Sequence, residues 1–181
     1  LHSYRELPVK YGEIGEIYDQ GQESHQWGLL RARSYTVDHL STFCSQEQLL
    51  QELISSLQFI DKTIKIFAFE VHWNLVTKSP NSKESKKKWE ESQADLIKAL
   101  KACGFSYSLD NEGKAPYGPV IEARIKDALG RTWKGPSVFI DIYHRDKFGL
   151  RYQDKDDQMH VPVMIGLSTF GSLERFIALL I

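Results

Sequence analysis

The chain has 181 residues, of which 41% are hydrophobic and 26% charged, and its formal net charge is −1. These values are ordinary for one globular domain with its own core, and they exclude a strong overall basic field that would recruit nucleic acid. The two cysteines, Cys44 and Cys103, form no disulfide framework and favour a reducing, cytoplasmic setting. No apolar run approaches the ~20 residues of a membrane helix, and the polar first residues do not have the pattern of a signal peptide.

A long hairpin is predicted near the start of the chain. Residues 11–19 alternate apolar and polar side chains, which is typical of a strand with one buried face. Residues 19–28 are polar and contain two glycines, so we expect a loose loop there. Residues 29–43 then return as the second strand of the hairpin.

A helix is predicted directly after this hairpin. Ser45 is followed three residues later by Gln48, as in a capping box, where each side chain bonds a backbone N–H of the other residue. Large apolar residues then recur at helical spacing as far as Phe67. The pattern predicts a helix over residues 46–69, about 36 Å long.

The rest of the chain predicts further strands and two more helices. One helix follows the polar loop 79–88 and stops at Gly104, and the final helix begins near Gly171. Strands are expected at residues 70–77, 105–110, 148–154 and 161–168, and on both sides of a turn at 129–131 within residues 116–144. The fold class is therefore α+β, a mostly antiparallel sheet flanked by two or three helices.

Several words of the sequence resemble one known family. "SYRELPVKYGEIGEIY", "GLLRARSYTVDH", "YGPVIEARIKDALGRTW" and "FGSLERFIALL" are similar, in one register, to the catalytic core of threonyl-tRNA synthetase, a class II aminoacyl-tRNA synthetase. The resemblance implies the class II fold, an antiparallel sheet flanked by helices. It also implies descent from enzymes that activate threonine with Mg-ATP and transfer it to tRNA. Fold kinship alone does not establish present activity, so each site position needs separate inspection.

The resemblance implies one core domain over residues 1–181. Motif 2 of the family would be the hairpin at about 11–43, and motif 3 would lie at about 161–181. We expect the dimer-forming motif 1, the editing domain and the anticodon-binding domain to have no counterpart in these residues. A dimer is possible, although the motif that forms it in the family is expected to have no counterpart here.

Three residues match the ATP-binding positions of the family. The resemblance implies that Arg31 faces the triphosphate, that Tyr35 stacks on adenine, and that Arg175 covers the other face of adenine. Residues i and i+4 of a strand share a face, so Arg31 and Tyr35 can serve one pocket. The alternative for Arg175 is a purely structural role, as an ion pair with Glu174 or a bond to a backbone group.

Two positions of motif 2 depart from the family. The family has an arginine that grips the α-phosphate and, two residues later, a glutamate. Asp19 and Gly21 stand at these positions here. A carboxylate at the first position would repel phosphate instead of binding it.

This chain also departs from the family at the positions of the zinc ligands. A catalytic zinc ion needs about three protein ligands, and the family takes two of them from histidines in the core. Ser41 and Gly166 stand at the two histidine positions. His39 lies two residues before Ser41, on the same face of a strand, and is a weak substitute candidate. The sequence therefore predicts no metal site.

The amino-acid pocket has kept one expected residue and changed others. Tyr117 matches the family tyrosine that lies near the amino group of threonine. Val120 replaces an expected lysine, and Lys134 and Phe139 replace two expected glutamines. Residues that support the sheet are kept, while residues that would contact the substrate are replaced. This is the pattern that relaxed selection on catalysis would leave.

Three hypotheses for function follow. The first is a degenerate, non-catalytic synthetase-like domain that keeps an adenine-nucleotide pocket and binds ATP, tRNA or another protein. The second is a functioning threonine–tRNA ligase core with an altered site. The third is a zinc-independent enzyme that adenylates another amino acid.

Overall fold

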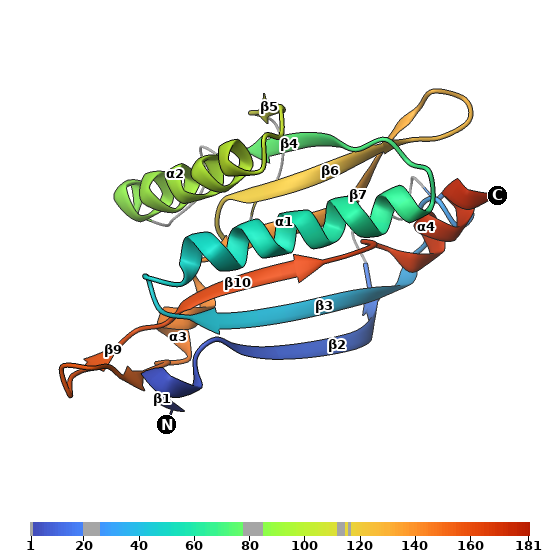
Figure 1. Cartoon of the computed structure of the whole chain (residues 1–181). Coiled ribbons are helices and arrows are strands. Elements are labelled where there is room, and N and C mark those ends of the chain that lie inside the picture. Colours follow the sequence, from blue (N-terminus) through green and yellow to red (C-terminus); the bar gives the residue numbers. More distant parts are fainter. Residues whose placement is uncertain (1, 20–25, 78–84, 112–114, 116) are drawn as a thin grey trace.

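A seven-stranded sheet is the central layer of the computed structural model, which describes residues 2–19, 26–77, 85–111, 115 and 117–181 (Figure 1). Neighbouring strands are antiparallel except for β4 and β5, which are parallel. The α+β prediction is therefore confirmed. The strand order across the sheet is β2 (Val9–Tyr18), β3 (Ser34–Cys44), β10 (Val163–Ser168), β7 (Thr132–Asp141), β6 (Val120–Lys126), β4 (His72–Val76) and β5 (Tyr107–Asp110).

Two long helices cover one face of this sheet. Helix α1 (Leu49–Ile66) lies across β7 and β10, and α2 (Lys86–Ala102) packs beside α1 and contacts β6 (Figure 1). The core lies between these helices and the sheet, because apolar residues of α1 recur at helical spacing on its buried face. The buried residues of α1 are Leu49, Leu53, Leu57, Ile60 and Ile64.

The predicted hairpin is present, but its second strand begins later than expected. β2 and β3 pair from Val9 opposite Phe43 to Tyr18 opposite Ser34. Residues 29–31 belong instead to a tight turn, in which Trp27 bridges to Leu29 and Arg31. The turn interrupts the strand because these local bridges replace cross-strand pairing. Residues 20–25, at the expected loose tip, lie outside the described part.

The first long helix begins three residues later than predicted. The backbone N–H of Ser45 donates to Gln48 Oε1 over 3.0 Å, so half of the expected capping box is present. The Gln48 amide nitrogen also donates to the carbonyl of Leu7 over 2.9 Å, which holds residues 46–48 in a turn. The helix ends at Ile66, three residues before the predicted end, and Ala68 follows with a positive φ of 59°.

The chain after β7 contains short elements that the sequence did not predict. A short helix, α3 (His144–Lys147), follows β7 directly. The strand expected at 148–154 is reduced to β8 (Tyr152–Gln153), which joins β1 (His2–Ser3) and β9 (Met159–His160) in a three-stranded sheet. These pieces are too short for sequence periodicity to reveal.

The last helix, α4 (Leu173–Leu180), begins close to the predicted start and contacts β3. Four α-helices are therefore present in the described part of the chain, where two or three were expected, since α3 adds one. Within the described ranges, no helix combines the length and the apolar character needed to cross a membrane.

Candidate nucleotide and amino-acid site

Arg175 on α4 is held by backbone carbonyls. Its Nε donates to the carbonyl of Leu30 over 2.9 Å, and one terminal nitrogen donates to the carbonyl of Lys134 over 3.2 Å. The guanidinium therefore joins the turn before β3 to the start of β7. Burial lowers the pKa of Arg175, Tyr35 opposes that shift and Arg31 adds to it, although an arginine stays protonated throughout the physiological range.

Glu174, the neighbour of Arg175, has a separate structural role. Both of its carboxylate oxygens accept from the backbone N–H of Thr36 at 2.9 Å, and one accepts from the Ser172 hydroxyl at 3.2 Å. Partial burial acts to raise the pKa of Glu174, but these hydrogen bonds outweigh it and the pKa is lowered. Glu174 thus ties α4 to β3.

The three predicted nucleotide-site residues come together at the edge of β3 and β7. The Cζ atoms of Arg31 and Arg175 lie 5.8 Å and 6.0 Å from the centroid of the Trp133 ring. Burial raises the pKa of the Tyr35 hydroxyl, Asp19 adds to that rise, and Arg175 opposes it. Tyr35 therefore lies within electrostatic range of Arg175.

Two tryptophans and a third arginine belong to the same cluster and were not predicted as site residues. The rings of Trp27 and Trp133 lie 5.8 Å apart. The Cζ atom of Arg131 lies 4.5 Å from the Trp27 centroid and 5.7 Å from the Trp133 centroid. Arg131 and Trp133 lie in the stretch "DALGRTW", which the sequence indicated only as a structural turn, and Trp27 lies in the predicted polar loop, so neither pattern indicated a site.

Asp19 is the residue that the family resemblance puts at the position of the motif 2 arginine. It follows β2 directly, and its backbone N–H donates to the carbonyl of Arg33 over 2.8 Å. Its carboxylate lies close enough to Tyr35 to raise the pKa of that hydroxyl. The second departing position, Gly21, lies outside the described residues.

The two expected zinc-ligand positions are neighbours in the structure. On adjacent strands, Ser41 of β3 and Phe139 of β7 both pair with Gly166 of β10. Directly opposed residues place their side chains on the same face of a sheet. A Cβ atom at residue 166 would lie under 3.0 Å from three carbons of the Phe139 ring.

These residues do not fit a zinc ion. His39 makes a 3.1 Å hydrogen bond to the Ser41 hydroxyl, and its ring lies 6.1 Å from that of Phe139. In the part of the chain that the structure describes, no three His, Cys, Asp or Glu side chains gather closely enough to hold a metal. The place of a second histidine is filled by the Phe139 ring.

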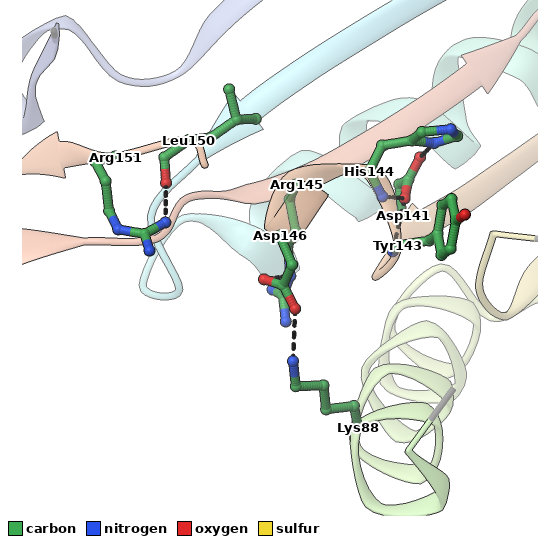
Figure 2. A network of polar contacts seen from close by, with 8 residues as sticks. All are labelled: Lys88, Asp141, Tyr143, His144, Arg145, Asp146, Leu150 and Arg151. Atoms are coloured by element: carbon green, nitrogen blue, oxygen red, sulfur yellow. Dashed lines mark hydrogen bonds and ion pairs between the residues drawn. The ribbon is translucent and has the colours of Figure 1, made fainter. Parts of the chain in front are cut away.

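A pocket of about 320 Å³ opens beside Phe139, and Tyr117 lines it. The backbone of Tyr117 is fixed, since its carbonyl accepts from the N–H of Ile142 over 2.9 Å. Its ring lies 4.6 Å from that of His144. Figure 2 shows the contact between His144 Nδ1 and the Asp141 carboxylate, which are 2.7 Å apart. The same Asp141 carboxylate accepts the N–H of His144, so it also caps the start of α3.

Lys134, a half-exposed residue, forms an ion pair with a buried carboxylate in place of an expected amide. Its Nζ contacts Glu122, whose side chain is 5% exposed and also lines the pocket. Arg124 contacts the other Glu122 oxygen at 3.2 Å. The pocket wall therefore carries a compensated carboxylate, where the family resemblance implied a glutamine amide for substrate contact.

Comparison with known proteins places this geometry among the synthetases. The family model described as "tRNA synthetase class II core domain (G, H, P, S and T)" matches residues 1–181. Threonine–tRNA ligases of Clostridium acetobutylicum and Carboxydothermus hydrogenoformans are 36% and 39% identical over 181 residues. These matches cover 100% of this chain but 28% of each relative, so the chain spans little more than a quarter of their length.

Solved structures agree with the sequence comparison. The structure titled as the RNA binding domain of threonyl-tRNA synthetase from Cryptosporidium parvum superposes with a TM-score of 0.93 at 27% identity, covering 99% of this chain and 45% of that chain. A putative threonyl-tRNA synthetase from Aeropyrum pernix has a TM-score of 0.71 at 20% identity, covering 94% and 41%. The latter likeness supports the fold alone.

Proposed function

The chain belongs to the class II tRNA synthetase core family, and from this premise we propose that it is a threonyl-tRNA synthetase-like domain that binds Mg-ATP but does not activate threonine in the family manner. The observation that carries the proposal is the meeting of Arg31 and Arg175 at the ring of Trp133. Two guanidinium groups beside an aromatic surface suit the phosphates and the base of a nucleotide.

The fixed orientation of Arg175 supports the adenine half of this proposal. Hydrogen bonds to the carbonyls of Leu30 and Lys134 engage the edge of the guanidinium and restrict its rotation. A planar cation that is already oriented loses little entropy when a base stacks on it. Tyr35 would supply the opposite face of the base, and Arg31 would contact the phosphates. Magnesium, when bound with ATP, would neutralise part of the phosphate charge.

Two features support the absence of ordinary threonine activation. Asp19 puts a negative charge where the family grips the α-phosphate, and that charge opposes the negative transition state of adenylate formation. Ser41 and Gly166 offer no imidazole, and the Phe139 ring fills the space beside Gly166. Among the described residues, these two positions therefore offer no ligand that would hold a zinc ion against the hydroxyl of threonine.

A second candidate function is an active threonine–tRNA ligase core with an altered site. The pocket of about 320 Å³ lined by Tyr117 favours it, because a pocket of this volume can accept an amino acid. In this case tRNA would be the partner of the whole protein.

Calorimetric titration with Mg-ATP tests the first proposal. We expect saturable binding by the wild type and an affinity roughly 5–30-fold lower for Arg175→Ala, since a cation–π contact of this kind contributes about 1–2 kcal/mol. Arg151→Ala is the matched control, because its guanidinium also donates to a backbone carbonyl, that of Leu150, outside the site. No binding by a folded wild type would contradict the proposal and direct attention to protein and RNA partners.

Exchange of pyrophosphate into ATP separates the two candidates. The first candidate predicts no threonine-dependent exchange, and the second predicts measurable exchange that is reduced in Tyr117→Ala.

A further inference from the structure

One carboxylate organises the hairpin turn between β6 and β7. Asp127 Oδ1 accepts from the backbone N–H groups of Leu129 and Arg131 at 3.0 Å and 2.9 Å. Its Oδ2 accepts from Arg131 Nε at 2.5 Å and from Trp133 Nε1 at 2.9 Å. Asp127 thus fixes a turn, a guanidinium and an indole ring at once.

The indole that Asp127 holds is the centre of the arginine cluster. Trp133 is only 7% exposed, and three guanidinium carbons, of Arg31, Arg131 and Arg175, lie 5.7–6.0 Å from its ring. Trp27 packs against the same ring. The residue after Trp133 supplies the carbonyl that accepts from Arg175. The orientation of one indole therefore sets where the arginines meet.

The three arginines around the Trp133 ring need a negatively charged partner. Three cations around one ring repel one another, and the repulsion is strong where water is partly excluded. Asp127 pairs with Arg131, which lies against both tryptophans. That pairing keeps Arg131 in place beside Trp27 and leaves Arg31 and Arg175 to face a ligand.

We propose that Asp127 is a positioning residue of the nucleotide site, acting through Trp133 and Arg131 on the placement of Arg31 and Arg175. This inference rests on the proposed binding of Mg-ATP and adds a residue that does not itself touch the nucleotide. A carboxylate with only a turn-capping role would affect stability and leave nucleotide affinity unchanged.

The experiment combines calorimetry with NMR of the Trp133 indole N–H in the whole chain. Asp127→Asn keeps an oxygen for the turn but removes the charge that pairs with Arg131. We expect at least about a tenfold loss of Mg-ATP affinity, and loss of the nucleotide-induced shift of the Trp133 indole signal. Asp156→Asn is the matched control, because Asp156 also accepts a backbone N–H of a turn, that of Gln158, and bonds a ring nitrogen, that of His160, outside the site. Its Mg-ATP affinity should equal that of the wild type.

The possible results distinguish failure of the positioning role of Asp127 from failure of the proposed Mg-ATP binding. Unchanged affinity in folded Asp127→Asn would overturn the positioning role and leave the nucleotide function intact. No binding by the wild type would overturn the nucleotide function, and the positioning role with it. If Asp127→Asn does not fold, Trp133→Phe keeps the ring and removes the donor to Asp127, and wild-type affinity in this variant would overturn the inference.

Discussion

The ring of Phe139 lies against the backbone of Gly166, its direct partner across β7 and β10. A Cβ atom on residue 166 would come within 3.0 Å of three ring carbons, a separation that real Cβ atoms essentially never show. The Phe139 ring can therefore occupy this place only while residue 166 has no side chain. This pair explains in physical terms why a histidine cannot occupy the position where the family has a zinc ligand.

Gly166→Ala is expected to destabilise the protein by about 1–3 kcal/mol, because the new methyl group forces the Phe139 ring or a strand to move. Chemical denaturation measures the effect. Gly12→Ala is the matched control, since Gly12 is also in a strand and its Cβ would meet only Leu40, at 4.0 Å. Phe139→Ala should remove most of the cost of Gly166→Ala in a double-mutant cycle. A cost that is unchanged in the Phe139→Ala background would refute the steric explanation.

Asp19→Arg is expected to tighten Mg-ATP binding by roughly tenfold, because a repelling charge near the phosphates becomes an attracting one. Calorimetry at low and moderate salt measures the change, and the gain should shrink as salt screens it. Glu13→Arg makes the same charge change farther along β2 and serves as the control. Equal gains from both variants would mean that total charge, not position, controls affinity.

Acid should remove the stabilising contribution of Asp127. Partial burial acts to raise its pKa, but hydrogen bonds from Trp133, Arg131 and Leu129 outweigh burial and lower the pKa from 3.8 to about 2. A lowered pKa stabilises the folded state above the unfolded value and stops doing so as pH falls through the folded value. The stability difference between wild type and Asp127→Asn should therefore be constant down to about pH 5 and shrink between pH 4 and pH 2. Urea denaturation across this range measures it, and a difference that persists undiminished at pH 2 would contradict the assignment.

Ala68→Gly is expected to stabilise the protein by about 0.5–1 kcal/mol. Ala68 follows α1 with φ at 59°, a left-handed conformation that glycine adopts without steric cost. Ala102→Gly, at the last residue of α2, should have the opposite sign, because glycine weakens a right-handed helix. Thermal unfolding of both variants measures the difference, and destabilisation by Ala68→Gly would contradict the conformational argument.

Regular elements were readable from the sequence where side-chain periodicity was long. The helix that contains Leu53, Leu57 and Ile60 and the antiparallel hairpin before it were both predicted, because burial on one face imposes a repeat of 3.6 or 2 residues. Element ends were less accurate. The turn around Trp27 and the use of Gln48 against Leu7 both depend on contacts between segments, which periodicity does not report.

The sequence could predict properties of the site only at positions where residue type alone decides the chemistry. The resemblance puts Asp19, Ser41 and Gly166 at the positions of an arginine and two histidines, and the predicted loss of their chemistry rests on residue type, whatever the fold. For Arg175, the structure shows the predicted alternative of a bond to a backbone group, while Glu174 bonds elsewhere. Which two carbonyls hold it did not follow from the sequence, because Leu30 and Lys134 are far from Arg175 along the chain.

By itself the sequence determined the fold class and the family, because these depend on composition, order and chemical type, and it supplied the prediction that the expected ligands are replaced. Tertiary structure alone decided that Phe139 closes over Gly166 and that Asp127 holds Trp133 among three arginines. The physical reason is strand register. A shift of one residue between neighbouring strands would put each of these side chains on the opposite face, and the packing of the whole sheet against its helices selects the register.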